Sequence, residues 1–197
     1  VIPIPARILA IDTADLDSDG TPELYVTILD RESLSSRVYL PTESGLVLLA
    51  DNLPWFFRGS GSDLKNRTIN VQGMDSDGKY YDGISELAKS GNRFEDRNPR
   101  KLPPQGNIFN FISFRDASGA ELTATLDEDG YLSVYEITGN KLWNSSDKYG
   151  GSETCFKHES LTQMRSIGDQ YRWTFIEQRI IALPDGTLIV PRNEGIF

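Results

Sequence analysis

The stretch ILAIDTADLDSDGTPELYV, residues 8–26, carries the strongest structural signal in this chain. Two runs rich in Ile, Leu, Tyr and Val flank a polar segment that ends in Gly20-Thr21-Pro22. Short apolar and β-branched runs bounded by Asp, Ser, Gly and Pro are typical of strands joined by a tight turn or loop. The stretch therefore predicts two strands with an acidic loop between them.

The loop places carboxylates at alternate positions. Acidic residues occupy its positions 1, 3, 5 and 9, namely Asp15, Asp17, Asp19 and Glu23. Gly20, at position 6, permits a sharp turn that folds the carboxylates inward. Calcium takes six to eight oxygen ligands, and four carboxylates this close would repel one another without a cation. A calcium loop is the prediction, and a solvated acidic hairpin without a metal is the alternative.

The loop is not an EF-hand. An EF-hand has a bidentate Glu at position 12 and a helix on either side. Position 12 here is Val26, and both flanks have the composition of strands. The backbone carbonyl of Thr21, at position 7, is the expected fifth ligand. The sequence therefore predicts a calcium loop between two strands.

Residues 8–26 resemble an FG-GAP/VCBS repeat, as found in integrin α-subunit propellers and in many bacterial propeller proteins. In that family the loop binds calcium between the first two strands of a blade. The resemblance implies Ca²⁺ ligands at Asp15, Asp17, Asp19, the Thr21 carbonyl and Glu23. It is specific over these nineteen residues and is a looser pattern of blades elsewhere.

The rest of the chain repeats a pattern of short strands. Blocks 7–50 and 107–146 each contain four β-rich runs, with a Glu-Leu pair opening the second run and a Val-Tyr pair in the third. Many short strands in repeating blocks of this size indicate a propeller. We therefore predict an all-β fold, a β-propeller of four-stranded antiparallel blades in which residues 1–197 form a single domain or a fragment. About three and a half blades are expected, at 7–50, 55–97, 107–146 and 170–197, so the ring is incomplete and other residues or another chain would close it.

Other segments lead to more local predictions. Residues 82–89 are the one candidate for a helix, and 96–105 has the Pro, Asn and Arg content of a loop. Residues 127–130 predict a hairpin turn, and 172–183 predicts one strand of the last blade. Trp55-Phe56-Phe57 is either a packed blade strand or a surface that binds a peptide or a sugar.

The loops of the other blocks keep only part of the calcium pattern. Asp116 and Glu121 remain in the third block, and Asp185-Gly186 has shrunk to a tight turn, so we expect no calcium at either. Asp75 and Asp77 retain half of the ligand set, which leaves open whether they bind a second ion.

Composition narrows the functional classes. The net charge of −9 and the lack of a clear basic patch argue against nucleic-acid binding. The sequence has no run of about 18 apolar residues, so no transmembrane segment is predicted. A single Cys155 forms no internal disulfide, and with His158 as the one histidine no catalytic dyad can be argued. We therefore expect a protein that is not an enzyme.

These features together predict a calcium-binding propeller module for protein–protein interaction or assembly. We expect an extracytoplasmic site of action, periplasmic, cell-surface or secreted, in a bacterium, because extracellular modules bind calcium at about 10⁻⁴–10⁻³ M. Two alternatives remain open. One is a structural subunit whose propeller is completed by another chain, and the other is a carbohydrate-active propeller domain that uses a pair of acids.

Overall fold

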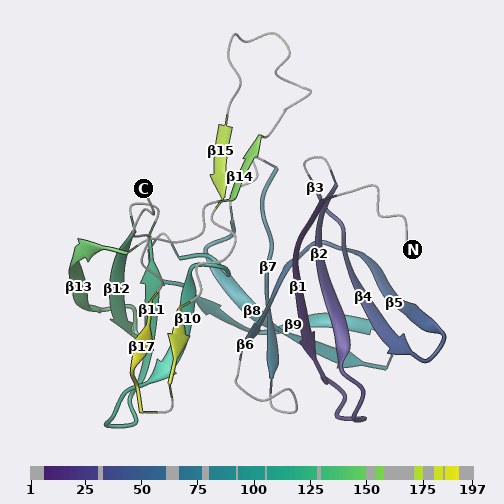
Figure 1. Ribbon diagram of the computed structural model, residues 1–197, viewed down its shortest axis with the longest axis horizontal. Coiled ribbons are helices and arrows are strands. Elements are labelled where there is room, and N and C mark those ends of the chain that lie inside the picture. The colour runs from purple at the N-terminus through teal and green to yellow at the C-terminus, as the bar shows by residue number, and fades with distance from the viewer. Residues whose placement is uncertain are drawn as a thin grey trace, which may run out of the picture. The chain divides into compact units, whose positions relative to one another are not determined.

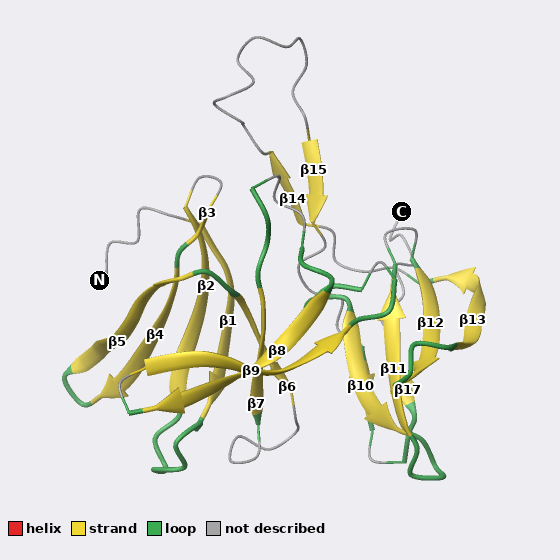
Figure 2. Cartoon of the chain, turned by 180° about the vertical axis from the view of Figure 1, so that it is seen from behind, coloured by secondary structure: helices red, strands yellow, loops and turns green. Residues whose placement is uncertain are grey.

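The computed structural model describes residues 7–30, 33–60, 67–76, 80–91, 93–104, 106–127, 130–149, 154–157, 171–174, 180–183 and 185–190. These residues form strands, turns and loops without a helix, which confirms the predicted all-β class (Figure 2). The chain divides into two compact units, Val1–Lys101 and Leu102–Phe197, and each is described by itself.

The first sheet contains the stretch 8–26 (Figure 1). Its strands are β1 (Arg7–Ala14), β2 (Glu23–Asp30), β4 (Ser36–Thr42) and β5 (Gly45–Leu53), with β3 (Ser33–Leu34) paired to β2. The order β1-β2-β4-β5 is antiparallel throughout and follows the chain. Ala14 is opposite Glu23 at the end of the first hairpin. The predicted loop therefore joins two paired strands of an antiparallel sheet.

The second sheet corrects two local predictions. Its strands are β6 (Phe56–Ser60), β7 (Thr68–Gln72), β8 (Gly83–Ser90) and β9 (Arg93–Lys101). The helix expected at 82–89 is wrong because β8 pairs with a strand on each side, and this pairing overrides a weak local preference. The loop expected at 96–105 is wrong up to Lys101. Pro99 lies in the edge strand β9, where a missing backbone N–H is tolerated.

The described residues of the second unit form one four-stranded sheet and two short hairpins. The sheet has the order β10-β11-β12-β13, with strands Phe111–Arg115, Glu121–Leu126, Tyr131–Glu136 and Lys141–Lys148. At the turn predicted over 127–130, the Gly130 N–H donates to the Asp127 carbonyl at 3.0 Å between the paired strands β11 and β12, and residues 128–129 lie outside the described residues. The hairpins are β14 (Thr154–Lys157) with β15 (Tyr171–Thr174), and β16 (Ile181–Ala182) with β17 (Leu188–Ile189).

The described strands of the fourth predicted block, 170–197, belong to two different sheets. The single strand expected over 172–183 is wrong, because β15 and β16 belong to different two-stranded sheets. The division follows from the pairing, since β15 pairs with β14 and β16 pairs with β17. No closed ring is detected for the residues described, so the propeller and its number of blades stay predictions.

The core of the first unit lies between its five-stranded sheet and its four-stranded sheet. It includes Tyr25 from β2 and Phe57 from β6, both fully buried, with ring centroids 5.6 Å apart in an edge-to-face arrangement. Polar side chains also join the sheets: the backbone N–H of Phe57 donates to Thr27 Oγ1 at 2.9 Å, and the Ser36 hydroxyl donates to the Trp55 carbonyl at 2.6 Å. This packing brings the β1–β2 loop within reach of the second sheet.

Candidate metal centre

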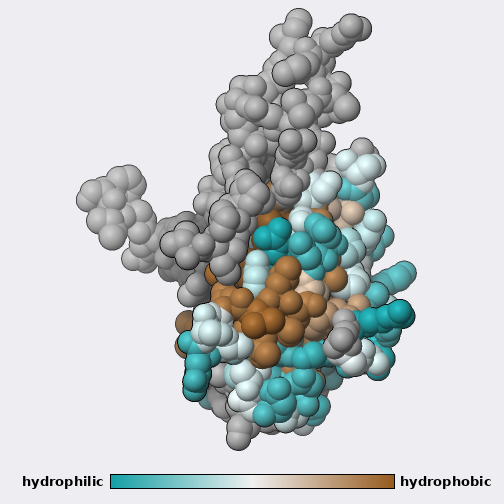
Figure 3. All heavy atoms as spheres, turned by 90° about the vertical axis from the view of Figure 1, so that its right-hand side faces the viewer, coloured by the Kyte–Doolittle hydropathy of each residue, from teal (hydrophilic) through white to brown (hydrophobic). Residues whose placement is uncertain are grey.

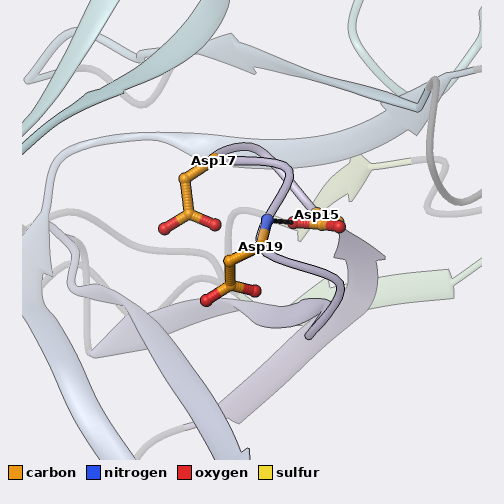
Figure 4. A group of neighbouring side chains, drawn as sticks. All are labelled: Asp15, Asp17 and Asp19. Carbon is orange, nitrogen blue, oxygen red and sulfur yellow. Dashed lines mark hydrogen bonds between the residues drawn. The ribbon is translucent and has the colours of Figure 1, made fainter.

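The loop between β1 and β2 is folded by its own aspartates. The two oxygens of Asp15 accept the backbone N–H groups of Asp19 at 3.0 Å and of Gly20 at 2.9 Å (Figure 4). Asp19 in turn accepts the N–H of Thr21 at 2.7 Å. Gly20 has a φ of 92°, a left-handed conformation that favours glycine. Local Asx-type hydrogen bonds thus fix the tight turn that the spacing predicted.

Three of the predicted ligands lie together. Asp15, Asp17 and Asp19 each place a carboxylate oxygen within 4.8 Å of the others. Asp15 is buried, whereas Asp17 and Asp19 are exposed, so the cluster opens to solvent on one side. Figure 4 shows the three side chains grouped on the inner side of the loop. Three hard oxygen donors at this spacing could hold a divalent cation, with water completing its coordination.

Glu23 is not part of this group of three. Its carboxylate is buried, and Oε2 accepts the Tyr25 hydroxyl at 3.1 Å and the Leu16 backbone N–H at 3.3 Å. Thr21 lies at the exposed end of the loop, where its N–H bonds to Asp19. The metal-ligand roles of Glu23 and of the Thr21 carbonyl therefore stay predictions.

Lys89 is a member of the site that the sequence did not identify. It lies in β8 of the second sheet, and its Nζ donates to Asp17 Oδ2 at 2.5 Å and to Glu23 Oε1 at 2.8 Å. The residue is 66 positions from Glu23, so no local spacing links it to the loop. Leu87 of β8 packs in the same core as Ala14 and Tyr25, and this packing brings Lys89 to the loop.

The pKa shifts reflect this ammonium group. The hydrogen bond from Lys89 lowers the pKa of Asp17 below its usual value, so Asp17 is ionised at neutral pH. Burial acts to lower the pKa of Lys89, but its bonds to Asp17 and Glu23 outweigh burial and raise it. Burial, and then the charge of Glu23, raises the pKa of Tyr25, so the hydroxyl of Tyr25 remains a proton donor.

The site retains an excess of negative charge. The loop carries four carboxylates, those of Asp15, Asp17, Asp19 and Glu23, and one ammonium group bonds to two of them, which leaves a formal charge of −3. Such an excess in one loop raises the local concentration of cations. The arrangement is suited to holding a cation and offers no arrangement of nucleophile and base.

The remaining predicted loops use their aspartates in turns. Asp116 Oδ1 accepts the N–H of Ser118 and of Ala120, each at 2.9 Å. Asp185 accepts the N–H of Thr187 at 2.9 Å, as expected for the tight Asp-Gly turn. Asp75 is described but Asp77 lies outside the described residues, so the question of a second ion stays open.

Two further residues singled out in the sequence are Cys155 and His158. Cys155 is in β14, where it pairs with Trp173 of β15, and His158 falls outside the residues described. Among the described parts of the chain, no helix is long and apolar enough to span a membrane. A comparison with models of known protein families found no match, and neither did a comparison with curated proteins.

Proposed function

We propose that this chain is a calcium-stabilised, propeller-type β module of the FG-GAP/VCBS kind that binds or assembles with other proteins outside the cytoplasm and is not an enzyme. The observation that carries this proposal is the convergence of Asp15, Asp17 and Asp19 within 4.8 Å. These carboxylates lie in the loop that joins two antiparallel strands of one sheet, which is the setting that the family resemblance implies.

The three aspartates would hold the ion, which supplies positive charge to a loop that is otherwise self-repelling. The effect of the bound ion would be to stabilise the structure of the loop. Asp15 is already bonded to the backbone of the turn, so holding its carboxylate in place also fixes the end of the β1–β2 hairpin. Asp17 extends this effect to the second sheet through Lys89. Loops and edges positioned in this way are the parts of a β module that recognise partners.

Calcium is expected to raise the melting temperature of the wild-type protein. With a dissociation constant of about 10⁻⁴–10⁻³ M, 10 mM calcium stabilises the folded state by about 1.4–2.7 kcal/mol. For a unit of about 100 residues this corresponds to an increase of about 6–20 °C. Differential scanning fluorimetry with calcium and with EDTA measures the shift, and magnesium at the same concentration tests for a charge effect that is not specific.

Asp17→Ala should abolish most of this shift, and Asp51→Ala is its matched control. Asp17 and Asp51 are each about one-third exposed, at 34% and 36%, and each is paired with a basic side chain. Both substitutions therefore remove a similar surface ion pair, but only the first removes a proposed ligand. No shift in the wild type, or an equal shift in Asp17→Ala, would overturn the calcium site.

The interaction part of the proposal is supported by the edge strand β5. Leu46, Val47 and Leu48 are consecutive and 44–48% exposed. Figure 3 shows an apolar patch on the face that lies at the right of Figure 1, where β4 and β5 are located. An exposed apolar edge has unpaired backbone groups and is a surface on which another strand can add.

Leu48→Glu tests assembly through this edge. Sedimentation velocity over a range of concentrations should show association of the wild-type chain that the substitution removes, because a charge on an edge strand opposes strand addition. Ile137→Glu is the control, since Ile137 is also an exposed apolar residue, at 66%, but lies in the second unit. A wild-type chain that is monomeric throughout would exclude self-assembly through β5.

A further inference from the structure

A second potential site lies in the first unit, away from the acidic loop. It is an open hollow of about 550 Å³ beside β8 and β9, within the volume range of small-molecule sites. Two aromatic residues and four charged residues define its chemistry: Trp55, Tyr81, Asp82, Asp96, Arg100 and Lys101.

Tyr81 is an exposed aromatic residue with a fixed position. Its backbone N–H donates to the Gly73 carbonyl at 3.1 Å, and its own carbonyl accepts the buried Gln72 amide at 2.7 Å. Its ring lies directly over Gly73, where an added Cβ would be 2.7 Å from the ring. The side chain is nevertheless 57% exposed. A ring that is held in place but open to solvent is preorganised to stack on a ligand.

Trp55 provides the second aromatic contact. It directly precedes β6 and is half-buried, packed against the core of the first unit. Its neighbours Phe56 and Phe57 are both buried. The sequence predicted that this aromatic run either packs or binds a ligand. In the structure, Phe56 and Phe57 pack in the interior, and Trp55 lines the hollow.

The charged residues of the hollow balance one another. Two carboxylates and two basic groups give a formal charge of zero. Among the described residues, none of Asp82, Asp96 and Lys101 has an oppositely charged group within 4.0 Å. The hollow therefore offers both hydrogen-bond donors and acceptors to a ligand. A phosphate or a nucleotide would face two carboxylates, and a purely apolar ligand would desolvate four charged groups.

We propose that this hollow binds a neutral saccharide. A sugar ring has apolar C–H faces that suit aromatic rings, and hydroxyls that both donate to carboxylates and accept from basic groups. The hollow is a binding site rather than a hydrolytic one: Asp82 and Asp96 are both exposed, whereas a glycosidase general acid sits in an apolar setting. This proposal does not depend on calcium binding at the loop.

Saturation-transfer NMR with glucose, galactose, mannose and maltose, each at 10 mM, tests the site on the complete chain. We expect a signal from at least one of these sugars, with a dissociation constant of about 1–10 mM for a ligand of this size. Tyr81→Ala should weaken that binding at least about tenfold, because it removes a stacking ring. Trp143→Ala is the control, since Trp143 is also an exposed ring, at 48%, in the other unit. Circular dichroism checks that both variants fold.

Three outcomes would overturn the proposal: no saccharide signal, an unchanged signal in Tyr81→Ala, or binding of a short peptide such as trialanine in place of sugars. The measurements are made with 5 mM calcium and again with EDTA. A saccharide signal that survives EDTA while the calcium melting shift is absent would reject the calcium site alone. A calcium shift without a saccharide signal would reject the hollow alone.

Discussion

Replacing Lys89 with Met should lower the free energy of unfolding by about 3–5 kcal/mol in the absence of calcium. Glu23 is 1% exposed, and its charged partner is the ammonium of Lys89 at 2.8 Å. Removing that ammonium leaves a buried carboxylate without a counter-charge, although Tyr25 and Leu16 still donate to it. The bond to Asp17 adds little, because Asp17 is one-third exposed and therefore screened. Urea unfolding followed by circular dichroism measures the loss.

Calcium should restore part of the stability lost in Lys89→Met. The substitution raises the formal charge excess of the site from −3 to −4, which strengthens cation binding at Asp15, Asp17 and Asp19. The melting shift produced by 10 mM calcium should therefore exceed that of the wild type. An unchanged shift would show that Lys89 and the proposed ion do not share the site.

Two further variants separate charge from packing at Lys89. Glu23→Gln combined with Lys89→Met removes both charges, and the double variant should be more stable than Lys89→Met alone. Lys148→Met is the control for loss of a lysine: Lys148 is exposed, with Nζ 5.2 Å from the Tyr131 ring centroid, and its loss should cost about 0.5–1 kcal/mol. If Lys89→Met and Lys148→Met lost the same free energy of unfolding, the result would contradict a stabilising buried ion pair at Lys89.

Lys89 also marks the limit of what the sequence could predict about the site. The grouping of Asp15, Asp17 and Asp19 was predictable because they are alternate residues in a stretch of five, and a tight turn brings such residues together by local geometry alone. Lys89 reaches the same place through the packing of two sheets, and nothing in its own neighbourhood sets it apart from any other lysine in a strand. The partners of Glu23 show the same limit, because Leu16 and Tyr25 are close to it in the sequence whereas Lys89 reaches it only through the packing of the sheets.

The same distinction between local and long-range interactions decides which strands could be predicted. The hairpins at 8–26 and 121–136 were predictable because turn residues and flanking apolar runs agree. The strand β8 was not, because its residues carry little strand preference and depend on β7 and β9 for hydrogen bonds. The strand β9 was hidden by Pro99, which is a loop signal unless the strand is at a sheet edge.

Gly130→Ala should destabilise the second unit by about 2–5 kcal/mol. Gly130 ends the β11–β12 turn with a φ of 85°, and a left-handed conformation costs an L-residue about 1–2 kcal/mol. An added Cβ would also lie 2.4 Å from the backbone carbonyl oxygen of Tyr149. That carbonyl belongs to the main chain, so relief requires a backbone shift, which costs about a further 1–3 kcal/mol. Tyr149 in turn donates its N–H to the Gly130 carbonyl, and the shift would strain this bond as well.

Gly139→Ala isolates the steric part of this effect. Gly139 lies in the next turn of the same sheet, between β12 and β13, with a φ of 92° and no atom within 4 Å of an added Cβ. It therefore carries only the conformational cost, and its substitution should destabilise by about 1–2 kcal/mol. Urea unfolding monitored by the fluorescence of Trp143, in β13 of this sheet, compares the two variants. Equal losses of stability in the two variants would mean that the Tyr149 carbonyl does not lie close to Gly130. They would therefore contradict the close packing of Tyr149 against the β11–β12 turn.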